Sequence, residues 1–289
     1  MGWKDEIQIS LSDKLKTHVE IDNYSYVGGG SINETFKIST SEGYFFVKKN
    51  SLSRYPQMFQ KEAKGLKLLC DASVIDIPEI VCVGQGSNDA FLILKFIDSA
   101  PMLVDFWTRF GEQLANLHKH TDNDFGLDHD NYIGSLYQRN NKHSHWSAFF
   151  REERLEFQLK MARDSGKMGN DITKAFDRFY KEIDNIFPKE PPALLHGDLW
   201  SGNFMVNQEG MPVIIDPAVY FGHREMDLGM SQLFGGFDSR FYSSYNKHYP
   251  LEKGWEERLN YCNLYPLLVH VNLFGGGYVQ SVKSIVNRF

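Results

Sequence analysis

The segment LHGDLWSGN, residues 195–203, constrains this chain more than any other feature. It places a carboxylate, Asp198, and an amide, Asn203, on one short polar loop. An apolar stretch, a polar turn and a second apolar stretch follow, and the second stretch leads directly into Asp216. Two apolar stretches around a polar turn predict a short hairpin. We therefore expect the chain to fold back so that Asp216 returns toward Asn203.

The order of carboxylate, amide and second carboxylate suits phosphoryl transfer. One carboxylate orients the acceptor hydroxyl and takes its proton, while oxygen ligands hold magnesium on the phosphates. The spacing of Asp198 and Asn203 matches the H-x-D-L-x-x-x-N pattern of kinase-like phosphotransferases. We predict three catalytic residues: Asp198 as base, with Asn203 and Asp216 as ligands of Mg²⁺. The alternative is an Asp that caps a turn, with an Asn in the next turn.

The composition is that of a folded, water-soluble protein. The chain has 289 residues, 42% hydrophobic and 24% charged, which is enough for one large domain or two lobes. Its net charge of −6 does not suggest a nucleic-acid partner. There is no signal peptide and no apolar run of about 18 residues, so neither export nor a membrane partner is expected. The three cysteines lack metal-ligand spacing, which favours reduced thiols in a cytoplasmic protein.

The first hundred residues predict a small lobe rich in β-strands. Strands with turn residues between them, and one helix with an apolar stripe, follow in the order strand, glycine turn, strand, strand, helix, strand, strand. That is the order of the small lobe of a kinase. The expected strands are residues 24–27, 34–40, 44–48, 80–83 and 91–96, and the expected helix is 56–71.

The rest of the chain is expected to be mostly helical, because apolar residues recur at spacings of three and four. The sequence thus predicts an α+β, protein-kinase-like bilobal fold, with a nucleotide-binding lobe at residues 1–97 and a catalytic and substrate lobe at 98–289. The expected helices are residues 104–119, 146–163, 172–186, 225–233 and 256–274.

The upstream residues supply candidates for nucleotide binding. Gly28, Gly29, Gly30 and Ser31 lie between two expected strands, where the backbone could pass close to phosphates. An ordinary glycine turn of a hairpin is the alternative. The segment Lys95, Phe96 and Ile97 is the expected hinge, whose backbone would bind adenine.

One lysine on the third strand is expected to contact the α- and β-phosphates. Lys48 and Lys49 both end that strand, and their side chains must face opposite ways because strand residues alternate. We predict Lys48 in this role, with Glu62 of the following helix as its partner. The alternative is an exposed ion pair of little energetic value.

With these residues assembled, the chain resembles the fructosamine kinase (ketosamine 3-kinase) family. The resemblance covers nearly the whole length. DLWSGN in place of a sparser H-x-D-x-x-x-x-N distinguishes this family from aminoglycoside and choline kinases. The segments that carry it are LHGDLWSGN (195–203), IDPAVY (215–220), GHREMDL (222–228), LFGGF (233–237) and NLFGGGY (272–278), with GGGSI (28–32) and FVK (46–48).

The resemblance implies an ATP-dependent kinase that phosphorylates the 3-hydroxyl of a ketoamine, the adduct of a sugar and an amine. The phosphorylated adduct is unstable and sheds the sugar, so the implied role is deglycation of small amines or protein lysines. Many bacterial members resemble ribulosamine or erythrulosamine kinases. Several members carry a Cys just after the glycines, where this chain has Ser31, so no disulfide switch is expected there.

Further residues near the loop have two interpretations each. Trp200 either stacks on the substrate or packs in the core. His223, Arg224 and Glu225 either face the substrate or lie on a surface loop. Asp227 is expected to accept bonds from the backbone of the catalytic loop, or else to favour a helix N-terminus by its charge.

Two other functions compete with a ketosamine kinase. One is a kinase for another small-molecule hydroxyl, such as an aminoglycoside or choline. The other is a pseudokinase that binds nucleotide as a scaffold, although every expected catalytic position is filled. The oligomeric state cannot be predicted.

Overall fold

The computed structural model describes residues 2–28 and 32–289. Gly29, Gly30 and Ser31, which we predicted to bind phosphates, lie outside the described residues. Two compact units account for the chain. Unit 1 comprises Met1–Leu103 and Phe204–Asp216, and unit 2 comprises Val104–Asn203 and Pro217–Phe289.

The division between the units differs from the predicted boundary after residue 97. The hairpin that precedes Asp216 groups with unit 1, whereas we had assigned it to the C-terminal lobe. Its contacts give the reason: Val213 forms a β-bridge with Asp76, and the N–H of Leu103 donates to the carbonyl of Gly210 at 3.2 Å. The chain therefore passes from unit 2 into unit 1 at Phe204 and returns to unit 2 after Asp216.

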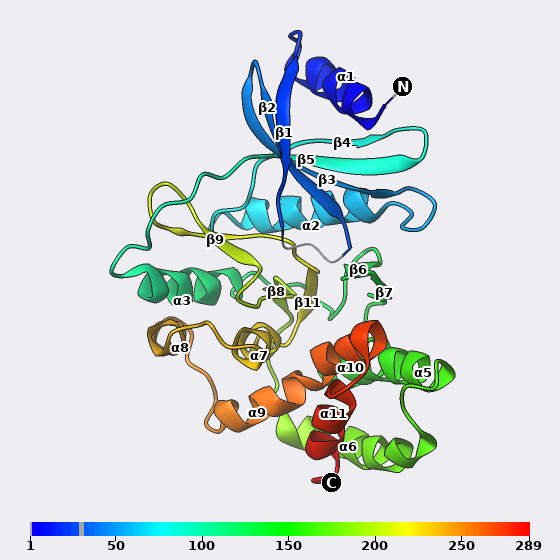
Figure 1. The fold of residues 1–289 in the computed structure, drawn as a ribbon. Coiled ribbons are helices and arrows are strands. Elements are labelled where there is room, and N and C mark those ends of the chain that lie inside the picture. The colour runs from blue at the N-terminus through cyan, green and yellow to red at the C-terminus, as the bar shows by residue number, and fades with distance from the viewer. Residues whose placement is uncertain (1, 29–31) are drawn as a thin grey trace. The chain divides into compact units, whose positions relative to one another are not determined.

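Unit 1 is built on an antiparallel sheet of five strands in the order β1-β2-β3-β5-β4 (Figure 1). Its strands lie close to the predicted ones, and the β9–β10 hairpin has the predicted form. Helix α1, which we had not predicted, precedes the sheet. The bounds are α1 Trp3–Leu15, β1 Ile21–Tyr26, β2 Glu34–Thr40, β3 Gly43–Ser51, α2 Met58–Ala72, β4 Ile80–Gln85, β5 Asp89–Lys95, β9 Phe204–Val206 and β10 Pro212–Ile214.

Alternation along the strands sorts the side chains of unit 1 onto two faces. On β5, Phe91 and Ile93 pack with residues of α1 in one core cluster. Leu92 and Leu94 pack with residues of α2 in another cluster. The two helices therefore cover opposite faces of the sheet, and each residue of β3 points toward one helix or the other.

Unit 2 is mostly helical, as predicted, with two small strand pairs that we had not predicted. Helix α7 has the predicted bounds, while the expected helix 256–274 is two helices that meet at Asn263. The bounds are α3 Phe106–Leu117, β6 Asn131–Ile133, β7 Leu136–Gln138, α4 Trp146–Phe149, α5 Glu156–Asp164, α6 Thr173–Ile186, β8 Ala193–Leu195, β11 Tyr220–Gly222, α7 Glu225–Leu233, α8 Ser239–His248, α9 Trp255–Cys262, α10 Leu264–Phe274 and α11 Tyr278–Val286.

A wide helical turn interrupts the predicted helix at residues 146–163. Residues Phe150–Leu155 form a π-helix between α4 and α5. Such segments are rare and occur where one extra residue is accommodated in a helix. Here the segment buries Arg154, whose guanidinium lies 4.0 Å from the ring centre of Tyr220 and donates to the Oδ1 of Asn140 at 2.7 Å.

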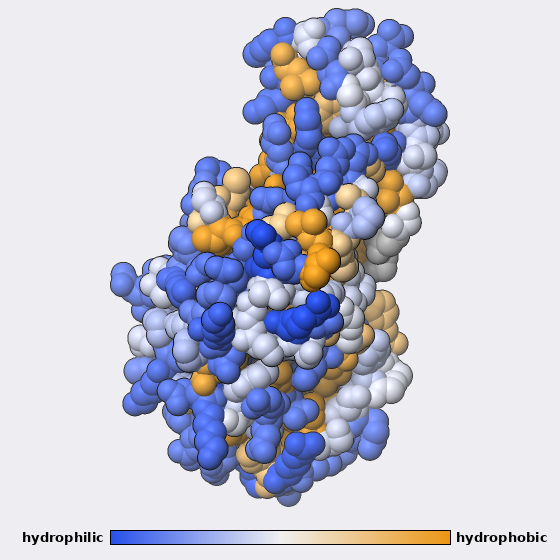
Figure 2. Space-filling view, turned by 90° about the vertical axis from the view of Figure 1, so that its left-hand side faces the viewer, coloured by the Kyte–Doolittle hydropathy of each residue, from blue (hydrophilic) through white to orange (hydrophobic). Residues whose placement is uncertain are grey.

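Hydrophilic side chains dominate the face of the molecule drawn in Figure 2, and hydrophobic ones form small groups. Within residues 2–28 and 32–289, no helix has the length and apolar character needed to cross a membrane.

Candidate active site

In unit 1, a buried lysine is held between two carboxylates. Lys48 lies on β3 facing α2, and its Nζ is 2.6 Å from the Oε1 of Glu62 and 2.6 Å from the Oδ1 of Asp216. Burial alone would lower the pKa of Lys48, but the charges of Asp216 and Glu62 raise it above its ordinary value. The ammonium is therefore charged, and it draws together helix α2, strand β3 and the end of the β9–β10 hairpin.

Its neighbour Lys49 faces the other way, as the alternation of the strand predicted. Its Nζ lies 3.3 Å from Glu34 and 3.2 Å from Asp89. Glu34 is more than half exposed, so this group borders on solvent. The two lysines thus have different surroundings although they are adjacent in sequence.

Asp216 combines two features of a residue under functional constraint. Its φ of 55° lies in the left-handed region, which non-glycine residues adopt rarely and aspartate more readily than most. Its side chain is 44% exposed even though it pairs with buried Lys48. The carboxylate is therefore accessible to a ligand from solvent.

The expected hinge is partly committed to the sheet. The N–H of Lys95 donates to the carbonyl of Glu79 at 2.9 Å, and the N–H of Phe96 donates to that of Tyr44 at 3.2 Å. Among the three predicted hinge residues, all of which the structure describes, Ile97 is the one whose N–H does not take part in these two bonds. Gly28 stands in open surroundings, since a Cβ there would meet no described atom within 4 Å.

In unit 2, Asp198 and Asn203 are joined directly. The Nδ2 of Asn203 donates to the carbonyl of Asp198 at 2.8 Å and to its Oδ2 at 3.0 Å. The first bond closes the loop, and the second fixes the direction of the Asp198 carboxylate. The spacing noted in the sequence therefore corresponds to a side-chain contact.

A buried aspartate anchors the start of this loop, as expected for Asp227. Its carboxylate accepts the N–H groups of His196 at 2.7 Å and Gly197 at 2.9 Å. Burial by itself would raise the pKa of Asp227. The hydrogen bond and charge of His118 and the N–H of Gly197 outweigh burial, so the pKa lies below its ordinary value. Gly197 has a φ of 82°, and a Cβ there would lie 2.1 Å from the carbonyl oxygen of Ala218, so only glycine fits.

Two histidines support this anchor. The Nε2 of His118 lies 3.2 Å from Asp227, and its Nδ1 lies 2.8 Å from the hydroxyl of Tyr245. His196 is fully buried, and its Nδ1 accepts the N–H of Asp198 at 3.2 Å. We did not predict a role for His118. A buried aspartate stays charged only if buried groups pair with it. That need for a partner of Asp227 is the only signal that would have pointed to His118.

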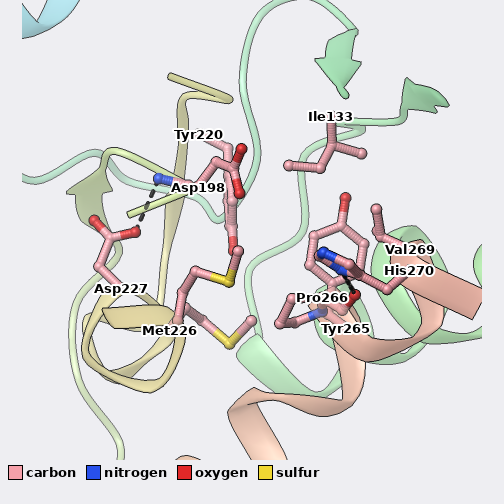
Figure 3. A pocket seen from close by; sticks show the side chains of 11 residues that line it. Ile133, Asp198, Tyr220, Met226, Asp227, Tyr265, Pro266, Val269 and His270 are labelled. Atoms are coloured by element: carbon pink, nitrogen blue, oxygen red, sulfur yellow. Dashed lines mark hydrogen bonds between the residues drawn. The ribbon is translucent and has the colours of Figure 1, made fainter. Parts of the chain in front are cut away.

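A cavity opens beside Asp198. Figure 3 shows Tyr220 and Met226 on one side, Tyr265, Val269 and His270 on the other, and the Asp198 side chain above. The hydroxyl of Tyr265 donates to the Oε1 of Gln138 at 2.6 Å. All of these residues belong to unit 2. We did not predict Tyr265 or His270, because they lie on α10 far from the loop in sequence.

Trp200 is half-buried and leans against its own loop. A Cβ at Gly202 would lie 2.3 Å from the indole, and the ring of Phe234 lies 6.2 Å away in an edge-on contact. The indole is thus neither fully packed in the core nor free of contacts. Its predicted contact with substrate stays a prediction.

The three residues predicted after Asp216 do not have the surroundings of a substrate site. His223, Arg224 and Glu225 are buried. Arg224 forms two bonds of 2.7 Å with Glu190, and Glu225 lies 2.6 Å from Arg258. Their partners come from distant segments, so proximity to Asp216 in sequence was misleading. We assign them a structural role and do not propose them as substrate ligands.

Comparison with known proteins places this arrangement in a family. The fructosamine kinase family model matches residues 3–289. A probable ketoamine kinase of Vibrio parahaemolyticus is 39% identical over 98% of this chain and 97% of its own. The chloroplastic protein-ribulosamine 3-kinase of Arabidopsis thaliana is 39% identical over 93% of this chain and 83% of its own. This chain belongs to the fructosamine kinase family.

Solved structures agree with the family and with the predicted fold. A proposed fructosamine-3-kinase of Haemophilus somnus superimposes with a TM-score of 0.89 at 30% identity, over 99% of this chain and 97% of its own. Choline kinase from Streptococcus pneumoniae, with a TM-score of 0.66 at 15% identity over 99% of each chain, shares the fold alone. The α+β, protein-kinase-like fold is therefore confirmed, and the family is one of ATP-dependent phosphotransferases.

Proposed function

We propose that this fructosamine kinase family member transfers the γ-phosphate of ATP to the 3-hydroxyl of a ketoamine, either a small molecule or an adduct on a protein lysine. The observation that carries the proposal is the carboxylate of Asp198, fixed by the amide of Asn203 beside a cavity. Relatives with names of ketoamine and ribulosamine kinases support this class of acceptor. We also place the reaction in the cytoplasm, as the sequence analysis expected.

Asp198 orients the 3-hydroxyl and accepts its proton as the bond to phosphorus forms. Alignment matters more here than strong basicity, because phosphoryl transfer depends on positioning and electrostatics. Asn203 fixes one carboxylate oxygen, and Asp227 fixes the backbone just before it. Lys48 neutralises charge on the α- and β-phosphates, with Glu62 holding the ammonium in place.

The donors present suit a magnesium ion. Asp216 offers a carboxylate that is accessible to solvent, and Asn203 offers an amide, both of which carry the hard oxygen atoms that Mg²⁺ prefers. We propose these two residues as its ligands. The ion would neutralise charge on the transferring phosphate.

The proposal is tested by measuring ATP consumption with Mg²⁺ while ribulose-lysine, erythrulose-lysine and fructose-lysine are each offered as acceptor. Unmodified sugars, choline and an aminoglycoside serve as comparison acceptors. We expect turnover on ketoamines alone, with phosphorus NMR placing the phosphate on C3. Turnover restricted to choline or the aminoglycoside would refute the ketoamine assignment, and ATP binding without any turnover would favour a scaffold.

We predict that Lys48→Met lowers kcat/KM for ATP by about 100-fold, the order of loss when one charge-stabilising donor is removed. Lys49→Met is the matched control, because it makes the same change on the adjacent residue of the opposite face. We expect the control to retain its ATP kinetics within about twofold. Steady-state kinetics with varied ATP checks both, and equal losses would remove the special role of Lys48.

A further inference from the structure

The cavity beside Asp198 has a chemical character that the transfer of phosphate to a hydroxyl does not by itself require. Among the described residues that line it there is no lysine or arginine, and the carboxylate of Asp198 contributes to its wall. Arg154 packs on the rings of Tyr220 and Tyr265 without lining the cavity. The cavity is therefore suited to a positive charge and not to a phosphate.

His270 supplies a hydrogen-bond acceptor to this cavity. Its Nδ1 lies 2.7 Å from the carbonyl oxygen of Pro266, which can only accept, so the proton of the neutral ring resides on Nδ1. Burial lowers the pKa of His270, and the ring is therefore neutral at pH 7. Within the described part of the chain, the Nε2 of His270 has no hydrogen-bond partner. That lone pair requires a donor from a ligand or water.

Aromatic rings extend from His270 toward the surface. The ring of Phe234 lies 4.8 Å from that of His270, and Tyr278 and Phe274 lie 5.0 and 5.5 Å from it. Phe234 and Phe274 are exposed. Aromatic faces attract cations and also pack on alkyl chains. The cluster thus continues the cavity wall outward with uncharged surface.

A ketoamine presents the matching group. Its secondary amine is protonated at neutral pH and offers only donors. The nitrogen is three bonds from C3, the carbon whose hydroxyl must meet Asp198 in the proposed reaction. A ligand placed for transfer therefore brings its positive nitrogen close to the base.

We propose that the cavity lined by Asp198, Tyr265 and His270 is the subsite for the protonated amine of the ketoamine, with the Nε2 of His270 as the acceptor for its N–H. The rings of Phe234, Phe274 and Tyr278 then carry the alkyl chain of the amine. This inference rests on the proposed function. It makes His270 a residue that distinguishes ketoamines from neutral sugars.

The test compares two acceptors that differ only at this nitrogen: a ribulose adduct of an alkyl amine and the neutral ether in which oxygen replaces the nitrogen. We expect the wild type to favour the amine in kcat/KM by more than tenfold. His270→Leu should lower kcat/KM for the amine by about 10- to 150-fold, the range expected for one hydrogen bond to a charged group. The same substitution should change kcat/KM for the ether by less than threefold. His270→Gln, which keeps a neutral acceptor, should restore part of the preference.

Because the amine-to-ether ratio is measured on one variant, a loss of folded protein cancels from it. His145→Leu, at an exposed histidine that does not line the cavity, is the matched control and should leave the ratio unchanged. Equal use of the two acceptors by the wild type, or an equal loss on both in His270→Leu, would overturn the subsite while leaving the proposed function intact. Failure of every ketoamine to react would overturn both.

Discussion

Asp198→Asn is expected to lower kcat by about 100- to 10,000-fold, the usual contribution of a positioned general base. Asparagine retains an oxygen that can accept the Nδ2–H of Asn203, so the loop keeps its shape. What is lost is the negative charge that orients the hydroxyl and takes its proton. ATP affinity should stay within about twofold, because Lys48 and Glu62 belong to unit 1 and are unchanged.

Rapid-quench kinetics and nucleotide titration together check this prediction. The matched control is Asp177→Asn, the same change at an exposed position of helix α6, which should leave kcat unaltered. Turnover by Asp198→Asn at the wild-type rate would disprove the role assigned to Asp198. A loss of ATP affinity of the same size as the loss of turnover would instead indicate damage to the fold.

Asp227→Asn is expected to lower the free energy of unfolding by about 3 kcal/mol, because the buried Asp227 carboxylate accepts charge-assisted hydrogen bonds from the N–H groups of His196 and Gly197. The asparagine also places an NH₂ donor where the carboxylate had an oxygen acceptor, so this NH₂ would face a backbone N–H donor. Turnover should fall as well, because Asp198 follows those two residues. Urea denaturation measures the first effect, and Asp164→Asn at an exposed site should change stability by less than about 0.5 kcal/mol.

Asp227 also makes the stability of the folded protein depend on pH. Since the pKa of Asp227 in the folded state lies below its ordinary value of 3.8, the unfolded chain binds its proton first as the pH falls. Its stabilising contribution is therefore complete above that ordinary value and disappears as the pH falls through the folded-state pKa. The stability of Asp227→Asn should accordingly decline less steeply below about pH 4 than that of the wild type.

Local patterns were sufficient where a contact depends on the period of one element. Alternation on β3 separated Lys48 from Lys49, and the spacing of apolar residues gave α7 its bounds. Helix α1 was missed because its buried side chains, Ile7 and Leu11, form too short an apolar stripe among charged residues. It is stabilised by packing on the sheet, which no local pattern reports.

The parts of the site that were missed depend on contacts between distant segments. His223 to Glu225 come soon after Asp216 in sequence, yet the ion pairs of Arg224 with Glu190 and of Glu225 with Arg258 hold them in the core. His270 looked like one residue in an apolar helical run, and only the packing of α10 beside Asp198 gives it a ligand-facing nitrogen. The break before α10 has a local cause, because Pro266 is tolerated only in the first turn of a helix.

The π-helix at Phe150–Leu155 changes how substitutions and deletions along this segment should be understood. It is equivalent to an α-helix with one residue inserted, so α4 and α5 are out of phase by about 100° relative to a continuous helix. Deleting one residue here would restore regular hydrogen bonds yet rotate buried Trp146 and Phe149 away from the core. In this stretch, loss of a residue changes which face of the helix is apolar more than it changes the helix length.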